Sequence, residues 1–274
     1  MSKIERGIPP EVDLSVDPAV IELAESLLQT KPDLERSAKW IQSPEKLARE
    51  KLWAGVLYKT LYPFLFFSCK GVEVFDGPPV FHEITVAFLG PNDTLIKPTR
   101  ISKVRSLTVE AGHQEIGPFE GTVFRGGRRR AEEEPVDPRV HSWVGRAIRK
   151  TGLDEIPQLK AAAEGKMAFI GPRGYTPEEL RDLRIAFEDP VLSQGITVND
   201  PLLKEGLLNY QEIMARAAPR PGIAGLYAAI LKKDLTFVER LLLDEYYCLC
   251  ATPIGDIRIV IATMKSTLKM TGAR

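Results

Sequence analysis

The sequence has few of the residues that build metal sites and disulfides. Only three cysteines and three histidines occur in 274 residues. Cys69, Cys248 and Cys250 form no C-x-x-C pair, and no segment resembles a secretory signal. We therefore expect a reduced protein that faces the cytosol. The histidines lie in three unrelated segments, which argues against a zinc site.

The sequence also lacks a net charge. Its 37 Lys and Arg residues balance 37 Asp and Glu residues, which argues against a broad surface for polyanions. The run FRGGRRR at residues 124–130 is followed directly by AEEEP, so opposite charges cancel locally. We interpret this stretch as a solvated loop and expect no nucleic-acid partner. Nucleic-acid binding through residues 125–130 stays an alternative hypothesis.

No run of apolar residues is long enough to cross a bilayer, which takes about 20 of them. The best candidate, residues 52–69, reads LWAGVLYKTLYPFLFFSC and contains Lys59 and Pro63. Proline removes a backbone donor and crowds the preceding turn, so it predicts a broken or kinked helix. The segment is compatible with a core helix of a soluble domain, an interfacial helix or a re-entrant one. Its amphipathic Trp and Tyr rings favour the interface.

The polar residues 1–50 have a helical pattern. Asp17-Pro18 and Ser43-Pro44 each place a capping residue before a proline, which predicts two helix starts. The second helix is expected to continue into the hydrophobic segment. We expect two parts, an N-terminal extension at residues 1–50 and a main domain at residues 51–274.

Two β-rich runs follow the hydrophobic segment. Residues 80–89 and 94–104 are joined by Gly-Pro-Asn-Asp, which predicts a hairpin. From residue 140 onward the pattern is mostly helical. The sequence thus predicts an α+β fold that is mostly helical, with one β-hairpin and short extra strands at most.

Adjacent carboxylates mark the most informative stretch. Asp154 and Glu155 precede a helical run, residues 156–164, that ends at Gly165. Taken alone, Asp154 is best interpreted as the N-cap of that helix. Basic residues upstream, and Gly-Pro-Arg and Arg-Pro-Gly loops downstream, instead favour a phosphate-handling site that could hold a divalent cation. A carboxylate in such a site can attack phosphorus and form an acyl phosphate.

The order of several motifs resembles the bacterial sugar transferases, the monotopic polyprenyl-phosphate phosphoglycosyl transferases. The motifs are DGPPVF, KVRS, DPRV, LDEIPQL, GKMAFIGPRG, RPGIAG and LDEYY. The resemblance covers about residues 52 to 268 in a consistent order. It implies a mostly helical catalytic domain with a re-entrant or interfacial hydrophobic helix at residues 52–69. It also implies a monotopic protein on the cytoplasmic face of the bacterial inner membrane.

The same resemblance implies an activity, namely transfer of a phosphosugar from a UDP-sugar to polyprenyl phosphate in a glycan pathway. Asp154 would be the nucleophile that attacks the sugar-bearing phosphate and expels UMP. Glu155 would assist attack by the polyprenyl phosphate, and Mg²⁺ would bridge Asp154 and phosphate oxygens. The basic residues that the resemblance assigns to substrate binding are Arg149, Arg173, Arg220, Arg146, Lys103 and Arg105.

The sequence departs from the family pattern at several positions. Lys166 replaces an acidic residue, Gly174 replaces a proline, and residues 228–233 replace the family segment A-Q-V-N-G-R. These changes leave the donor sugar and the glycan pathway open, and oligomeric state is not encoded in any motif. They also support an alternative, a catalytically weak member that acts as a membrane-tethered partner of glycan assembly enzymes.

Overall fold

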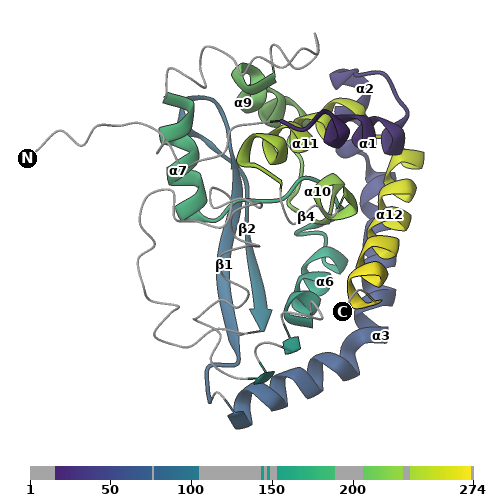
Figure 1. Cartoon of the computed structure of the whole chain (residues 1–274). Coiled ribbons are helices and arrows are strands. Elements are labelled where there is room, and N and C mark those ends of the chain that lie inside the picture. The colour runs from purple at the N-terminus through teal and green to yellow at the C-terminus, as the bar shows by residue number, and fades with distance from the viewer. Residues whose placement is uncertain are drawn as a thin grey trace, which may run out of the picture.

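The computed structural model describes residues 16–75, 77–104, 143–144, 147–148, 153–188, 206–230 and 235–272. Helices surround two small sheets (Figure 1), so the predicted α+β class, mostly helical with one hairpin, is confirmed. The elements are α1 (Pro18–Leu28), α2 (Leu34–Ile41), α3 (Pro44–Phe75), β1 (Phe81–Leu89), η1 (Pro91–Asp93), β2 (Leu95–Val104), η3 (Leu153–Glu155), α6 (Ile156–Ala163), β3 (Ala168–Ile170), α7 (Pro177–Glu188), α9 (Gly206–Ala217), β4 (Gly222–Ala224), α10 (Leu226–Ile230), α11 (Phe237–Cys250) and α12 (Pro253–Gly272).

The first two helices pack against the C-terminal ones. The Asp17 carboxylate caps α1 by accepting a hydrogen bond from the Ala19 amide, as the Asp-Pro pair predicts. Helix α1 contacts α11 and α12, and α2 contacts α9 and α11. The division expected between residues 50 and 51 falls inside α3, so one helix continues from the extension into the main domain.

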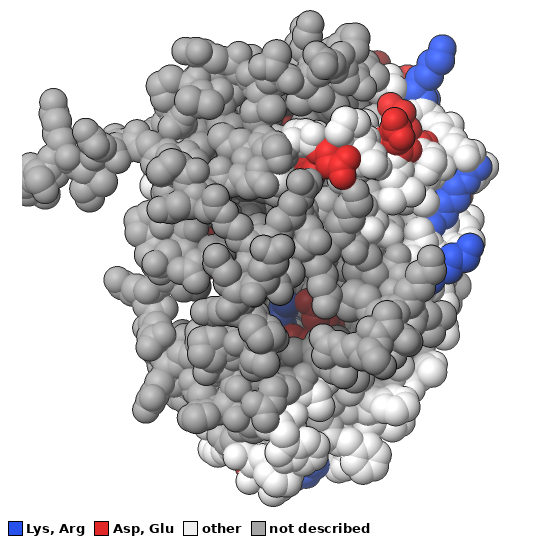
Figure 2. Space-filling model, viewed as in Figure 1, with Lys and Arg blue, Asp and Glu red and all other residues white. Residues whose placement is uncertain are grey.

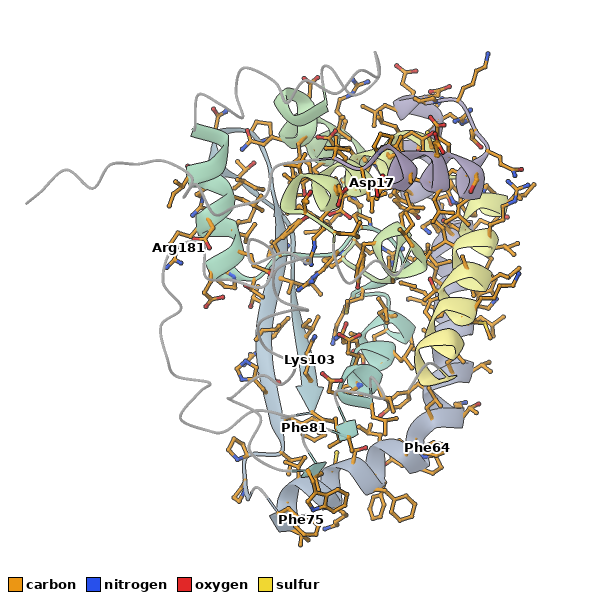
Figure 3. The ribbon with its side chains drawn as sticks, viewed as in Figure 1. Asp17, Phe64, Phe75, Phe81, Lys103 and Arg181 are labelled. Carbon is orange, nitrogen blue, oxygen red and sulfur yellow. The ribbon has the colours of Figure 1, made fainter. Side chains whose placement is uncertain are left out.

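Helix α3 is long and bent. It begins at Pro44, where the Ser43 hydroxyl accepts a hydrogen bond from the Lys46 amide at 3.1 Å, and it continues through the hydrophobic segment as expected. Pro63 lies inside it. The helix runs beside α12 and then turns sharply near Phe64 to cross the foot of the molecule (Figures 1 and 3), because proline cannot donate to the preceding turn. None of the helices in the described residues is both long and apolar enough to span a membrane.

The predicted hairpin is present. Strands β1 and β2 pair antiparallel, from Phe81 opposite Val104 to Leu89 opposite Leu95, and the turn between them contains η1. The only other strands in the described residues, β3 and β4, form a short parallel pair. This agrees with the expectation of short extra strands at most.

The β3–β4 pair brings the Gly-Pro-Arg and Arg-Pro-Gly loops together. The Gly171 amide donates to the Ala224 carbonyl at 2.9 Å, and the Gly222 amide donates to the Pro172 carbonyl at 2.8 Å. A Cβ atom on Gly222 would lie 2.5 Å from the backbone of Gly171. Glycine is therefore required at this position, since any side chain would force the two loops apart.

A buried ionic network joins the first half of α3 to α12. Lys46 Nζ lies 2.7 Å from both Glu50 Oε1 and Asp256 Oδ2, and all three side chains are almost fully buried. Lys46 also donates to the Ile170 carbonyl at the end of β3. The start of the bent helix is thus attached to the strand that precedes the Gly-Pro-Arg loop.

Candidate active site

The two adjacent carboxylates lie at the start of α6. Asp154 and Glu155 end the short helix η3 and are both partly exposed. Pro157 lies in the first turn of α6, where a missing amide donor costs no hydrogen bond. The N-cap of α6 is Glu155, and its side chain makes no capping hydrogen bond. The interpretation of Asp154 as the N-cap is therefore wrong, because the last residue of η3, Glu155, occupies the capping position.

Strand β2 supplies a cation to this pair. Lys103 Nζ lies 2.9 Å from Glu155 Oε1, although the two residues are 52 positions apart in the sequence. The contact forms because β2 packs against both η3 and α6. Figure 3 shows Lys103 directed from the strand toward α6. In the space-filling view, acidic and basic side chains are visible together near the centre of this face (Figure 2).

The Gly-Pro-Arg loop supplies a second cation. The Arg173 amide donates to Asp244 Oδ1 at 3.3 Å, and Arg173 Nη2 lies 3.4 Å from Glu179 Oε1. Burial lowers the pKa of the Arg173 guanidinium, but the charge of Glu179 opposes it and the net shift is upward. The charge of Glu155 also raises this pKa, so Arg173 and Glu155 share one electrostatic environment.

Two further residues of the site were missed in the sequence analysis. Burial and the charge of Glu155 raise the pKa of Tyr227, on α10, to about 12. Burial and the charge of Arg173 lower the pKa of Arg240, on α11. Neither residue belongs to the LDEYY motif. Arg240 lies just before it, four positions ahead of the motif's aspartate, Asp244. That spacing corresponds to one helical turn and is the signal that could have identified Arg240.

Arg220 lies at the other end of α6. Its Nη1 donates to the Gly165 carbonyl at 3.2 Å, and its Nη2 lies 3.3 Å from Glu50 Oε2. Helix α6 has eight residues and separates this position from the carboxylate pair by about 12 Å. The structure therefore does not bring Arg220 to Asp154 and Glu155, and its assignment to substrate binding stays a prediction.

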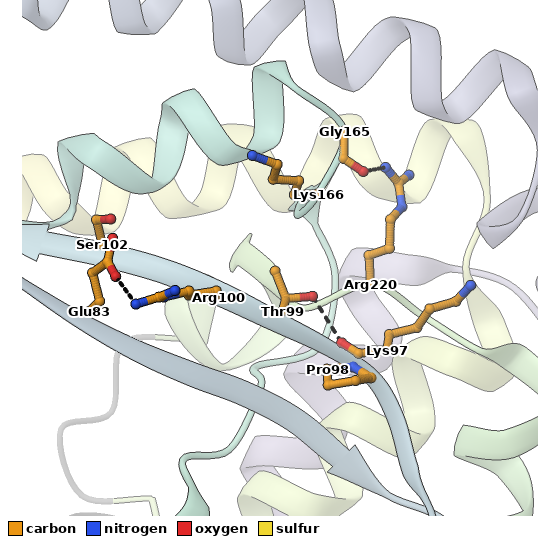
Figure 4. A pocket seen from close by; sticks show the side chains of 9 residues that line it. All are labelled: Glu83, Lys97, Pro98, Thr99, Arg100, Ser102, Gly165, Lys166 and Arg220. Carbon is orange, nitrogen blue, oxygen red and sulfur yellow. Dashed lines mark hydrogen bonds and ion pairs between the residues drawn. The ribbon is translucent and has the colours of Figure 1, made fainter.

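Arg220 instead contributes to a basic pocket of about 580 Å³ along β2 (Figure 4). The lining residues are Glu83, Lys97, Pro98, Thr99, Arg100, Ser102, Gly165, Lys166 and Arg220. Arg100 forms an ion pair with Glu83 across the hairpin, and Lys166 lies 2.6 Å from Glu164. Most of the cations in this pocket are therefore already paired within the protein.

The other predicted phosphate ligands, Arg105, Arg146 and Arg149, lie outside the described residues. Within the described ranges, no group of three or more His, Cys, Asp or Glu side chains could hold a metal ion. Magnesium at phosphate-transfer sites is commonly held by one or two carboxylates, substrate oxygens and water. The partly exposed pair Asp154 and Glu155 fits that mode of binding.

The carboxyl group of Asp244 determines a pH dependence of stability. Burial raises its pKa from 3.8 to about 7, although hydrogen bonds from Tyr175 and the Arg173 amide act in the opposite direction. The unfolded chain loses this proton near pH 4 and the native chain near pH 7, so the native state loses stability between these values. The loss is on the order of 4 kcal/mol.

We expect the Asp244→Asn variant to lack this titration. The difference in unfolding temperature, wild type minus variant, should fall as the pH is raised from 4 to 7 and stay level above pH 8. Thermal unfolding followed by circular dichroism at several pH values measures it. If the unfolding temperatures of the two proteins changed with pH in parallel, the pH dependence could not be assigned to Asp244.

A carboxylate pair, a lysine from β2 and the arginine of the Gly-Pro-Arg loop thus share one region at the start of α6. Residues 45–270 match the protein-family model described as bacterial sugar transferase. Since the match covers most of the chain, the protein belongs to this family, and the resemblance noted in the sequence is confirmed.

Curated relatives of known name support this conclusion. The chain is 33% identical over 137 residues to an undecaprenyl-phosphate galactose phosphotransferase of Salmonella typhimurium, which covers 50% of this chain and 23% of that protein. It is 27% identical over 200 residues to the galactosyl transferase CpsE of Streptococcus agalactiae, with 72% of this chain and 36% of the relative covered. An undecaprenyl-phosphate glucose phosphotransferase of Komagataeibacter xylinus is 29% identical over 137 residues, covering 47% of this chain and 21% of the relative. The chain thus matches about a fifth to a third of the length of these relatives.

Proposed function

We propose that this protein transfers a phosphosugar from a UDP-sugar to polyprenyl phosphate as a membrane step of glycan synthesis. The observation that carries the proposal is the pair Asp154 and Glu155 at the start of α6, with Lys103 bonded to Glu155. The printed names of the relatives, undecaprenyl-phosphate galactose and glucose phosphotransferases, support the acceptor and the type of reaction.

The first half-reaction forms a covalent intermediate. The Asp154 carboxylate attacks the sugar-bearing phosphorus, the bond from that phosphorus to the bridging oxygen breaks, and UMP leaves with the electron pair. At an effective dielectric constant of 20, two unit charges 4 Å apart repel by about 4 kcal/mol. An anionic nucleophile therefore needs cations near the diphosphate, and Arg173 is one that shares the electrostatic environment of Glu155. Magnesium bound at Asp154 would supply further positive charge.

The second half-reaction releases the enzyme. A phosphate oxygen of the polyprenyl phosphate attacks the same phosphorus, and the bond to Asp154 breaks to give a polyprenyl diphosphate sugar. Glu155 assists this attack as a base or by orienting the acceptor, and Lys103, 2.9 Å away, holds the Glu155 side chain in place. The same residues thus serve two sequential displacements.

The second half of α3 supports a place at the membrane surface. Its exposed apolar side chains lie at the foot of the molecule, between Phe64 and Phe75 (Figure 3). Phe67 is 70% exposed, whereas Leu65 and Val72 are buried against the protein. Helix α3 also contacts η3, so an interfacial helix here would hold Asp154 and Glu155 close to the phosphate of a membrane-bound acceptor. The proposed location is the cytoplasmic leaflet.

Replacing the exposed rings should release the protein from lipid. We expect the double variant Phe64→Ser and Phe67→Ser to bind liposomes at least tenfold more weakly than wild type, since each buried Phe contributes about 1.5–3 kcal/mol. Liposome co-sedimentation measures it. Leu95→Ser, at an exposed apolar position near the hairpin turn, is the matched control and should bind as wild type does. Equal binding by all three proteins would exclude this surface as the anchor.

The test of the function uses the protein in detergent with a panel of UDP-sugars and no lipid acceptor. Release of UMP and a protein mass increased by one phosphosugar are expected with at least one donor. Absence of both signals with every donor, and absence of product when polyprenyl phosphate is added, would contradict the proposal. That result would favour the alternative of a membrane-tethered partner without its own activity.

A further inference from the structure

Helix α11 directs an arginine toward the Gly-Pro-Arg loop. The helix starts at a capping box formed by Thr236 and Glu239. Asp244 faces the loop, because its carboxylate accepts hydrogen bonds from the Arg173 amide and, at 2.8 Å, from the Tyr175 hydroxyl. Arg240 is four residues earlier and so lies on the same side of the helix, one turn away.

The guanidinium of Arg240 has no fixed partner in the described part of the chain. Among those residues it donates no hydrogen bond and forms no ion pair, although it is partly buried. Its strongest charged neighbour is another cation, Arg173, which lowers its pKa. A partly buried guanidinium without a partner has lost part of its hydration. Two adjacent guanidiniums fit an anion that accepts hydrogen bonds from both.

A neutral donor lies beside the two arginines. Both Arg173 and Arg240 affect the pKa of Tyr227, as does Glu155. Because that pKa is about 12, the phenol keeps its proton at neutral pH and can donate it in a hydrogen bond. Arg173 and Tyr227 thus share the electrostatic environment of Glu155, and Arg240 shares that of Arg173 and Tyr227.

We propose that Arg240 and Arg173 together bind a phosphate group of the substrate, with the Tyr227 hydroxyl as a third donor. Asp244 acts as a positioning residue, because it holds the backbone of Arg173 opposite Arg240. The proposal rests on the proposed function, which supplies two sources of the phosphate, the diphosphate of the UDP-sugar and the phosphate of the polyprenyl acceptor. In this arrangement Arg240 has the role that the sequence analysis assigned to Arg220.

The decisive measurement is the affinity for inorganic pyrophosphate by isothermal titration calorimetry. We expect Arg240→Met, which keeps the length of the side chain and removes its charge, to weaken binding about 10- to 100-fold, since a hydrogen bond to a charged group is lost. Arg240→Lys should weaken it less. The matched control is Arg216→Met, at an exposed position on α9, and it should bind as wild type does. Unfolding temperatures establish that each variant is folded. If Arg240→Met does not fold, the affinity of Arg240→Lys alone provides the test.

The two half-reactions distinguish the source of the phosphate. We call Arg240 and Arg173 together the arginine clamp. If an Arg240 variant releases UMP more slowly without lipid acceptor, the clamp binds the diphosphate of the donor. If it releases UMP normally but polyprenyl phosphate discharges the adduct more slowly, the clamp binds the phosphate of the acceptor. Weaker pyrophosphate binding in a protein that turns over no UDP-sugar would support the clamp and contradict the proposed function. Unchanged pyrophosphate affinity in both Arg240 variants would overturn the clamp, whatever the activity.

Discussion

The Asp154→Asn variant is expected to release UMP at least a thousandfold more slowly than wild type and to form no phosphosugar adduct. An amide nitrogen or oxygen is a far weaker nucleophile than a carboxylate, and the first displacement cannot proceed without one. The measurement is UMP release together with intact-protein mass, in detergent and without lipid acceptor. The fold should be unaffected, since Asp154 is partly exposed at a helix start.

Two other carboxylates separate this effect from a general loss of charge. Glu164→Gln, at the exposed far end of α6, is the matched control and should keep wild-type activity. Glu155→Gln should still form the adduct and discharge it slowly to polyprenyl phosphate, because Glu155 serves the second displacement. If Asp154→Asn formed an adduct at the wild-type rate, the nucleophile would be another residue.

The second large effect is expected at Asp256, in the buried network. Its Oδ2 accepts hydrogen bonds from Lys46, Arg49 and Trp40, at 2.7, 3.1 and 3.0 Å, and its Oδ1 accepts one from Tyr247 at 2.9 Å. Asp256→Asn removes the charge opposite Lys46 and turns an amide donor toward groups that are themselves donors. We expect the free energy of unfolding to fall by about 3–5 kcal/mol, the usual effect of removing one partner of a buried ion pair.

Thermal unfolding in detergent tests this expectation. A loss of that size corresponds to a decrease in unfolding temperature of roughly 6–20 °C for a domain of this length. Asp93→Asn breaks an exposed ion pair with Arg184 and should change stability by less than about 1 kcal/mol. Equal unfolding temperatures for wild type and Asp256→Asn would show that the network contributes little. Because Lys46 also bonds the Ile170 carbonyl, we further expect reduced activity in this variant below its unfolding temperature.

Local features were predictable from the sequence. The Asp17-Pro18 and Ser43-Pro44 pairs identified the starts of α1 and α3, because a capping side chain bonds amides two or three residues away. The hairpin followed from two β-rich runs and a short turn. The start of α6 at Ile156 was correct, but its capping residue was placed one residue too early, because a 3₁₀ turn precedes the helix.

The composition of the site was predictable only in part. Asp154 and Glu155 lie in a contiguous motif, so their adjacency needed no tertiary information. The only sequence signal for Arg240 was its spacing of four residues from Asp244, and it was weak because an arginine on an amphipathic helix is usually solvated. Its importance emerged from the packing of α11 against the Gly-Pro-Arg loop, where Asp244 binds the Arg173 amide.

By itself, the sequence determined the family, the carboxylate pair and the helices and hairpin that carry it, because these depend on short motifs and nearest neighbours along the chain. The tertiary structure decided which cations meet the pair. It placed Lys103 against Glu155 across 52 residues and attached Arg220 to Glu50. It also brought Arg240 beside Arg173. Such pairings depend on how helices and strands pack. Composition, here the few metal-binding residues and the zero net charge, therefore could not predict them.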